Sequence, residues 1–409
     1  MIMDRILLLS LLCVSNLFSQ SYQLIRYDIK TNKIDTLPMI DFNNYKTSEF
    51  TNWNYGIDNN FELLSLEPPQ NSFNNSGFTD FLPAQKFFDI NKFPVRTAVK
   101  IYWMENDTLR QRCSGILIAK NYVLTDCHCI GITDSLSNFV FEDSSYIYPA
   151  FDNGILNPLW NTTEAIEYIT FKENLHDSYP PLIDIALIKL KDSIGLMNGW
   201  IGLGFNEDNS FFENNVFHKF SYPGTVDYSN STRIFNGDTL YYNYGKLGLV
   251  QSNWIGYNIT GIPGQSGSSL FYTNNSNEYY SLGTLVWSGF SRHRRINKEI
   301  FYSFKSILES DVSSIATESD NRNQYFLANA FPNPFNPSTV IKYSMKNSGF
   351  VELIVFNLLG QEIVKLINEE QQAGDHQVEF NAIGLASGIY FYRLQTENFV
   401  ETKKMLLIR

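Results

Sequence analysis

A histidine, an aspartate and a serine lie in three separate segments, and together these residue types could perform nucleophilic hydrolysis. His128 follows an apolar run and is flanked by two cysteines, in VLTDCHC. Asp184 lies inside PPLIDIALIKL, and Ser266 lies between two glycines in GIPGQSGSS. A histidine held in one tautomer can take a proton from a hydroxyl, and a buried carboxylate is a natural partner for the imidazole N–H. The three residues therefore predict a general base, the acid that orients it and a nucleophile.

The residues before His128 predict a strand that ends at the imidazole. Apolar runs at 115–119 and 122–125 are joined by the turn residues Lys120 and Asn121. Short apolar runs bounded by turn residues are typical of strands. His128 therefore comes directly after the second of two paired strands.

The segments of Asp184 and Ser266 also predict defined structure. Apolar residues surround Asp184 on both sides, which predicts a buried strand, and an unpaired carboxylate there would be costly to desolvate. Gly264 and Gly267 flank Ser266 and permit a tight turn whose N–H groups face one point. A strand is expected just after this turn, at residues 270–272.

Taken singly, each of these residues has an ordinary structural interpretation. A histidine beside an apolar run is usually a hydrogen-bonded core residue. Asp184 could cap a turn, and the segment of Ser266 could be a surface loop. Their order along the chain, histidine then aspartate then serine, is however the order of the chymotrypsin-type catalytic triad. The combination favours the catalytic interpretation.

Residues from about 90 to 312 resemble a chymotrypsin-fold serine endopeptidase of the bacterial branch that includes the staphylococcal glutamyl endopeptidase. The resemblance is carried by CSGILIAKNYVLTDCHC, DIALIKL, FHKFSYPG, GIPGQSGSSLF and SLGTLVWSG. It implies an all-β fold of two antiparallel six-stranded β-barrels with the active site between them. It also implies Ser266 as nucleophile, His128 as base and Asp184 as its partner, with the backbone N–H groups of Gly264 and Ser266 as the oxyanion hole.

Two residues before His128 depart from the family pattern, which usually has two alanines there. Asp126 could perturb the imidazole or face solvent, and we expect it to face solvent. Cys127 competes with Cys129 as the partner of Cys113, and the resemblance implies a Cys113–Cys129 disulfide. Cys127 would then be a free, buried thiol.

The substrate pocket is less clearly encoded than the triad. The resemblance places Thr260, Val286, Trp287 and Ser288 in its wall. The neutral Thr260 argues against a preference for Arg or Lys, and Val286 before the tryptophan gives no support for glutamate. The basic cluster at 292–295 could attract an acidic side chain, but we expect a solvated loop. An apolar or mixed pocket is an equally fair expectation.

Composition and the N-terminus predict an exported globular protein. The chain has 409 residues, 44% of them hydrophobic, and a formal net charge of −11. It has no basic stripe, so nucleic-acid binding lacks electrostatic support. Residues 1–20 are typical of a signal peptide, whose apolar stretch at 6–14 is too short to span a membrane, and no stretch elsewhere reaches about 18 apolar residues. Residues 21–90 are either a propeptide or an N-terminal strand extension.

The C-terminal part predicts a separate β-module. Residues 91–312 would be the protease domain, 313–325 a linker and 326–409 a small β-sandwich. Its strands are expected at 339–343, 351–356, 377–380, 389–395 and 400–408. FPNPFNPSTVIKYS, VFNLLGQEIVKL, LASGIYFYRLQ and VETKKMLL resemble the type A C-terminal sorting domain of the type IX secretion system. That resemblance implies passage across the outer membrane and a cell-surface or released product.

The sequence thus predicts an exported serine endopeptidase that acts on proteins or peptides through an acyl-enzyme, with no cofactor and no metal. Its other partner would be the type IX secretion machinery. Two alternatives remain open at this point. One is a catalytically inactive homologue that binds partners at the cell surface, and the other is a structural surface protein.

Overall fold

The computed structural model describes most of the chain in two compact units. Residues 22–40, 45–54, 66, 79, 81–105, 108–134, 138–153, 162–175, 183–227, 230–287, 291–319, 325–327, 330 and 335–408 are described. The first unit is formed by Met1–Ile147 with Thr163–Ser303, and the second by Tyr148–Thr162 with Phe304–Arg409. The signal peptide predicted at residues 1–20 lies outside the described residues.

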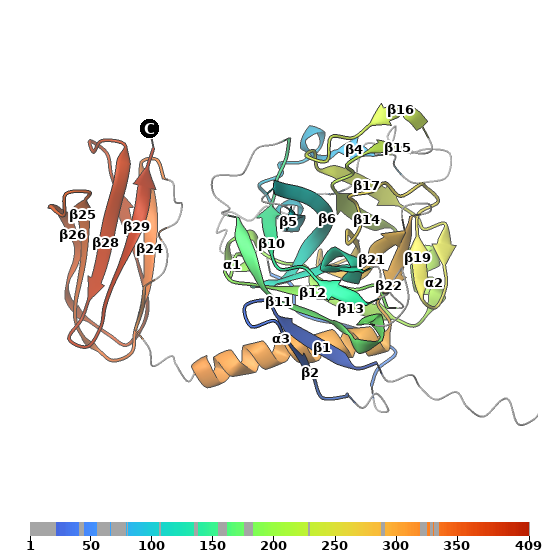
Figure 1. Ribbon diagram of the computed structural model, residues 1–409. Helices are drawn as coiled ribbons and strands as arrows, with labels where there is room; N and C mark the ends of the chain where they lie inside the picture. The colour runs from blue at the N-terminus through green and yellow to red at the C-terminus, as the bar shows by residue number, and fades with distance from the viewer. Residues whose placement is uncertain are drawn as a thin grey trace, which may run out of the picture. The chain divides into compact units, whose positions relative to one another are not determined.

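Six strands of the first unit close into a barrel (Figure 1). Around the barrel they are β10 (Ser145–Pro149), β5 (Ala98–Glu105), β6 (Thr108–Ala119), β7 (Tyr122–Thr125), β12 (Ala186–Leu190) and β11 (Thr163–Phe171). The barrel closes because Tyr146 of β10 pairs with Glu164 of β11. The pairs from β5 through β6, β7 and β12 to β11 are antiparallel. The strands expected at 115–119 and 122–125 are confirmed as the end of β6 and as β7.

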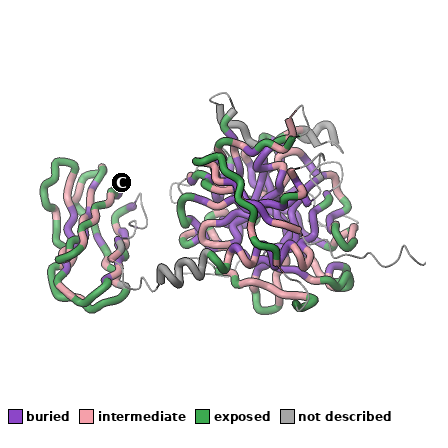
Figure 2. Tube along the Cα trace, turned by 60° about the horizontal axis from the view of Figure 1, so that its bottom comes forward, coloured by how far each residue is buried: buried purple, intermediate pink, exposed green. Residues whose placement is uncertain are grey.

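Apolar side chains alternate into this barrel and fill it. Val99 and Ile101 of β5, Leu117 of β6, Val123 of β7 and Ile188 of β12 are all buried in one cluster. Burial of each such side chain contributes about 1.5–3 kcal/mol. The buried segments gather in the interior of this unit (Figure 2), so the strand that leads to His128 is anchored in a packed core.

A second, curved sheet makes up the rest of the first unit. Its strands are, in order, β18 (Leu249–Val250), β19 (Trp254–Gly256), β22 (Arg292–Arg295), β21 (Tyr279–Trp287), β20 (Ser269–Thr273), β14 (Phe217–Ser221), β17 (Tyr241–Gly245) and β4 (Leu82–Pro83), with β13 (Gly202–Asn206) paired in parallel to β21. Among the described residues this sheet is a half-barrel, beside the closed barrel. The all-β, trypsin-like class predicted from the sequence is confirmed.

The N-terminal segment adds strands to both sheets. β1 (Leu24–Asp28) pairs with β11 beyond the point where β10 ends, and β2 (Lys33–Thr36) pairs with β1. β3 (Ser48–Phe50) pairs with β13, and β4 pairs with β17. The described strands of the N-terminal segment are therefore hydrogen-bonded to both main sheets.

Helices and short hairpins complete the first unit. They are α1 (Gly195–Asn198), α2 (Asn209–Asn214), the start of α3 (Lys298–Ser319), β8 (Gly131–Thr133) with β9 (Phe139–Phe141), and β15 (Val226–Asp227) with β16 (Asn230–Ile234). The helix α3 continues to Ser319, so the first part of the linker predicted at 313–325 is helical. A helix begun on apolar residues can extend through polar ones, since each added residue costs little once the helix is nucleated.

The second unit contains a β-sandwich. One sheet has β23 (Phe326–Leu327), β24 (Ser338–Met345) and β27 (Gly374–Asn381), and the other has β26 (Glu362–Gln371), β25 (Gly349–Asn357), β28 (Gly388–Gln395) and β29 (Val400–Leu407). Both sheets contribute to one buried cluster, which includes Ile341 of β24 and Leu353 of β25. The predicted sandwich is confirmed, and β26 is an additional strand at its edge.

Candidate active site

His128 lies on a short 3₁₀ turn, Cys127–Cys129, that follows β7 directly. Both cysteines of this turn are fully buried, whereas the imidazole keeps 15% of its surface exposed. A disulfide joins Cys129 to Cys113 of β6, with an S–S distance of 1.99 Å and a Cα–Cα distance of 5.9 Å. Cys127 is a free, buried thiol. The turn is therefore fixed to the barrel on its buried side and presents the imidazole outward.

Asp184 contacts His128 at two points. Its Oδ2 lies 2.7 Å from Nδ1 of the imidazole, and its Oδ1 accepts the backbone N–H of His128 at 3.0 Å. Because a carboxylate only accepts hydrogen bonds, Nδ1 carries the hydrogen, and in the neutral imidazole Nε2 is the nitrogen without one. Asp184 is completely buried, so its orientation is fixed by these contacts and by its own backbone.

Two polar side chains that the sequence did not single out hold the backbone on either side of Asp184. Asn174 accepts the N–H of Ile183 and donates to its carbonyl, both at 2.8 Å. Thr170 donates to the carbonyl of Ile185 at 3.0 Å and accepts from Asn174 at 2.9 Å. A lone asparagine in a polar turn carries no sequence signal for this role. The four bonds fix the turn that carries the carboxylate.

Ser266 lies on a tight turn between two glycines with left-handed backbone. Gly264 has φ of +93° and Gly267 has φ of +79°. Gln265 is buried, accepts the N–H of Ile262 at 2.9 Å and donates to Ser221 at 2.6 Å. In the described part of the chain, neither the Gly264 N–H nor the Ser266 N–H donates a hydrogen bond. Both N–H groups are thus available to a substrate oxygen.

The turn of Ser266 is docked against the strands that lead to His128. The N–H of Ser114 on β6 donates to the carbonyl of Ser266 at 2.8 Å, and its hydroxyl donates to the carbonyl of Gly264 at 2.8 Å. A Cβ at Gly267 would lie 2.0 Å from the Thr125 hydroxyl, so only glycine fits there. Among the described residues, the Ser266 hydroxyl itself makes no hydrogen bond, including none to His128.

Asp126 is completely buried, so the expectation that it faces solvent is wrong. Its Oδ2 accepts the N–H of Gly267 at 2.7 Å and lies 4.0 Å from Nδ1 of His128. Burial, and next the charge of Asp184, raise the pKa of Asp126 well above its usual range. The sequence could not reveal this burial because the hydrogen-bond donor comes from a turn that is 141 residues away.

The predicted pocket residues are only partly described. Thr260 is half-buried and Val286 is buried at the end of β21, whereas Ser288 and the side chain of Trp287 lie outside the described residues. The basic cluster at 292–295 is not the solvated loop that was expected. It forms β22, and its last three side chains are buried. Arg295 shows why, because it donates to acceptors on three neighbouring segments.

Two groups of potential metal donors occur among the described residues, and both contain His128. In the first, the sulfurs of Cys113 and Cys129 are bonded to each other and are not thiolate ligands. In the second, Asp126 and Asp184 flank a ring nitrogen that is already hydrogen-bonded. The donor chemistry fits a hydrogen-bonded acid–base site better than a metal centre.

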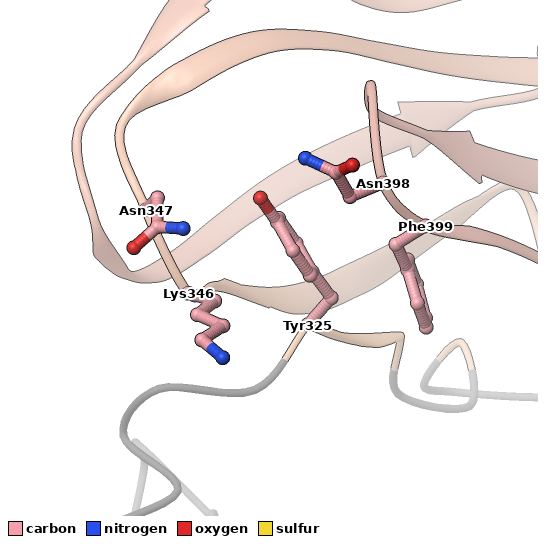
Figure 3. A pocket seen from close by; sticks show the side chains of 5 residues that line it. All are labelled: Tyr325, Lys346, Asn347, Asn398 and Phe399. Atoms are coloured by element: carbon pink, nitrogen blue, oxygen red, sulfur yellow. The ribbon is translucent and has the colours of Figure 1, made fainter.

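An open pocket of about 490 Å³ lies in the second unit, beside the β-sandwich strands (Figure 3). Tyr325 and Phe399 line it with stacked rings whose centroids are 5.6 Å apart. Its remaining lining residues are Lys346, Asn347 and Asn398. None of the triad residues contributes to this pocket.

Comparison with known proteins identifies the C-terminal domain. Residues 329–408 match the family described as the secretion system C-terminal sorting domain. The predicted sorting domain is confirmed, and it marks the protein for type IX export and for secretion or attachment at the cell surface. No described helix is both long enough and apolar enough to cross a membrane.

The remaining comparisons concern the whole chain. A solved structure titled "Structure of Glu endopeptidase in complex with MPD" is similar to this chain at 17% sequence identity, with a TM-score of 0.42. The similarity covers 58% of this chain and 99% of that one. No curated protein matches the sequence.

Proposed function

We propose that residues 91–312 are an exported serine endopeptidase that hydrolyses peptide bonds through Ser266, His128 and Asp184. The observation that carries the proposal is the two-point contact of Asp184 with His128, at 2.7 Å and 3.0 Å. It fixes the tautomer in which Nε2 can accept a proton, as a general base requires. The sorting domain supports the export of this enzyme.

The proposed reaction has two stages. Ser266 Oγ attacks the carbonyl carbon of the scissile bond while His128 takes the hydroxyl proton. The C–N bond then breaks, the imidazolium gives its proton to the leaving amine, and an acyl-enzyme remains. A water molecule activated by the same imidazole hydrolyses the ester and restores the serine. The N–H groups of Gly264 and Ser266 would stabilise the oxyanion, with about 3 kcal/mol from each.

The missing hydrogen bond between Ser266 and His128 is compatible with this role. Hydrogen bonds between catalytic groups are often long before substrate binds and tighten in the reacting complex. Ser266 is half-buried on a turn whose backbone is held by Ser114, and the proposed mechanism requires its hydroxyl to reach the imidazole when substrate binds. The inactive-homologue alternative requires that this contact never forms.

Labelling with a fluorophosphonate probe tests the proposal directly. The folded, secreted protein should be labelled at Ser266, and Ser266→Ala should remove the label. The control Ser276→Ala changes an exposed turn serine and should keep it. A folded wild-type protein that stays unlabelled and cleaves no member of a peptide library would refute the proposed peptidase activity. The remaining alternative would then be an inactive homologue that binds partners at the cell surface. For an active protein, the same library would report the preferred side chain.

We also propose that residues 21–90 remain in the mature enzyme as a strand extension. β1, β3 and β4 each pair with a strand of the main sheets, which is support for a structural role over that of a propeptide. N-terminal sequencing of the secreted protein tests this. A mature terminus near residue 91 would contradict it.

A further inference from the structure

Asp126 joins the two halves of the proposed site. It immediately precedes the 3₁₀ turn that carries His128, and its Oδ2 accepts the N–H of Gly267, the residue after Ser266, at 2.7 Å. This is a direct side-chain tie between the base segment and the nucleophile turn. Since the Gly267 N–H also donates to the carbonyl of Leu285 at 2.9 Å, the turn is fixed between the half-barrel and Asp126.

The surroundings of Asp126 favour a neutral carboxyl. One of its oxygens and one of Asp184 lie within 4.8 Å of each other, and two buried carboxylates this close do not both ionise readily. Asp184 accepts two hydrogen bonds from His128. Oδ1 of Asp126 and the Thr284 hydroxyl are both buried, and the hydroxyl lies next to the Asp126 carboxyl. The Thr284 hydroxyl can donate to an ionised carboxylate or accept from a protonated one, so this contact accommodates a neutral Asp126, and it is the nearby Asp184 carboxylate that favours it.

The other titratable groups near Asp126 do not reverse this preference. They are His128, the buried thiol of Cys127, and Arg294 of β22, which interacts with Asp184. His128 favours the ionised form of Asp126 but is already hydrogen-bonded to Asp184. Burial raises the pKa of the Cys127 thiol well above its usual value, so that group stays neutral and adds no charge beside Asp126.

We propose that Asp126 is a positioning residue of this site, a neutral carboxyl that accepts the Gly267 N–H and thereby holds Ser266 in register with His128. This inference rests on the proposed hydrolase function. It assigns a role to a residue that stands where the resembled family has an alanine. The role needs an acceptor oxygen at residue 126 and no negative charge.

Two substitutions distinguish the role of the acceptor oxygen of Asp126 from the role of its negative charge. Asp126→Asn keeps an oxygen for the Gly267 N–H, and its NH₂ group can bond the Thr284 hydroxyl. Asp126→Ala removes the acceptor. A misplacement of about 1 Å can cost on the order of 100-fold in rate, so Asp126→Ala should lower kcat by about 10- to 100-fold with KM almost unchanged. Asp126→Asn should stay within about threefold of wild type, with the acidic limb of its pH–rate profile unmoved.

A matched control is Ser268→Ala, because that buried hydroxyl has no hydrogen-bond partner. It should keep the wild-type kcat. Rates are normalised to folded protein by circular dichroism. Wild-type kcat in folded Asp126→Ala would overturn the positioning role. A loss in Asp126→Asn as large as in Asp126→Ala, or a shifted acidic limb, would show that the charge matters and overturn the neutral carboxyl.

The test remains informative in two harder cases. If Asp126→Ala does not fold, the kcat and pH profile of Asp126→Asn still decide between an acceptor and a charge. If the wild-type protein shows no Ser266-dependent labelling, the proposed function itself has failed, and the role of Asp126 falls with it. Labelling of the wild type and of Asp126→Ala at equal rates would instead refute only the inference about Asp126.

Discussion

Replacing Asp184 by asparagine should inactivate the proposed enzyme without unfolding it. In Asp184→Asn the amide oxygen takes the place of Oδ1, which accepts the N–H of His128 at 3.0 Å. The NH₂ group then points at Nδ1, which lies 2.7 Å from Oδ2 in the wild type. Two donors cannot face each other, so the hydrogen of the imidazole moves to Nε2. That nitrogen can then no longer accept the proton of Ser266.

The expected loss is large because the wrong tautomer removes the base entirely. A tautomer error of this kind costs about 10⁴-fold in kcat, which corresponds to roughly 5 kcal/mol in the barrier. Folding should be largely retained, since the amide has the shape of the carboxylate and removes a buried charge. The hydrogen bonds from Asn174 and Thr170 hold the backbone on either side of residue 184, and the substitution leaves them in place.

The assay compares kcat on one cleaved peptide at pH 7, with thermal unfolding as the test of folding. Asp192→Asn is a matched control, because Asp192 is exposed and accepts from Thr163 away from the site. It should retain wild-type activity. If Asp184→Asn keeps kcat within tenfold of wild type, the assignment of Asp184 as the partner of the base is refuted.

Three further predictions follow from the described contacts. Asn174→Ala removes three hydrogen bonds around Ile183 and should lower the free energy of unfolding in urea by about 3 kcal/mol; a loss below about 1 kcal/mol would contradict the bracing role. Burial lowers the pKa of Lys219 to about 7, so between about pH 7 and pH 10 the unfolded chain holds a proton that the folded protein has released. Stability should therefore rise with pH in this window relative to Lys219→Met, by roughly 4 kcal/mol at most; parallel pH curves for the two proteins would exclude the shift. Deletion of residues 329–408 should leave the protein inside cells that have a type IX system, as judged by blotting cells and medium, with the Ser266 label intact; normal release would disprove the sorting role.

The parts of the site that were predictable from sequence have strong local signals. Glycines on both sides of Ser266 predict a tight turn. The positive φ values observed at Gly264 and Gly267 are values that favour glycine. The apolar run around Asp184 predicts that this residue is buried, and in the structure it is completely buried. Strands of the sandwich were predicted wherever apolar residues alternate. β26 was missed because it is an edge strand with mostly polar, partly exposed side chains.

The features that could not be predicted depend on partners far along the chain. The basic run at 292–295 looks solvated until acceptors on other segments are known, and Arg295 finds its acceptors at Asn206, Asn209 and Gln251. Asn174 braces the turn of Asp184 through bonds that no local pattern encodes. In each case a polar residue is buried because the tertiary fold satisfies its hydrogen bonds.

The two buried aspartates show how one polar site can assign different roles to the same residue type. Asp184 accepts two N–H groups of His128. Asp126 accepts the N–H of Gly267, and the Thr284 hydroxyl lies next to its carboxyl. A second charge at Asp126 would be opposed both by burial and by Asp184, as the direction of its pKa shift reflects. In the proposed site the two roles follow from the partners of each carboxyl: Asp184 would support the imidazole of His128, and Asp126 would hold the turn on which Ser266 lies.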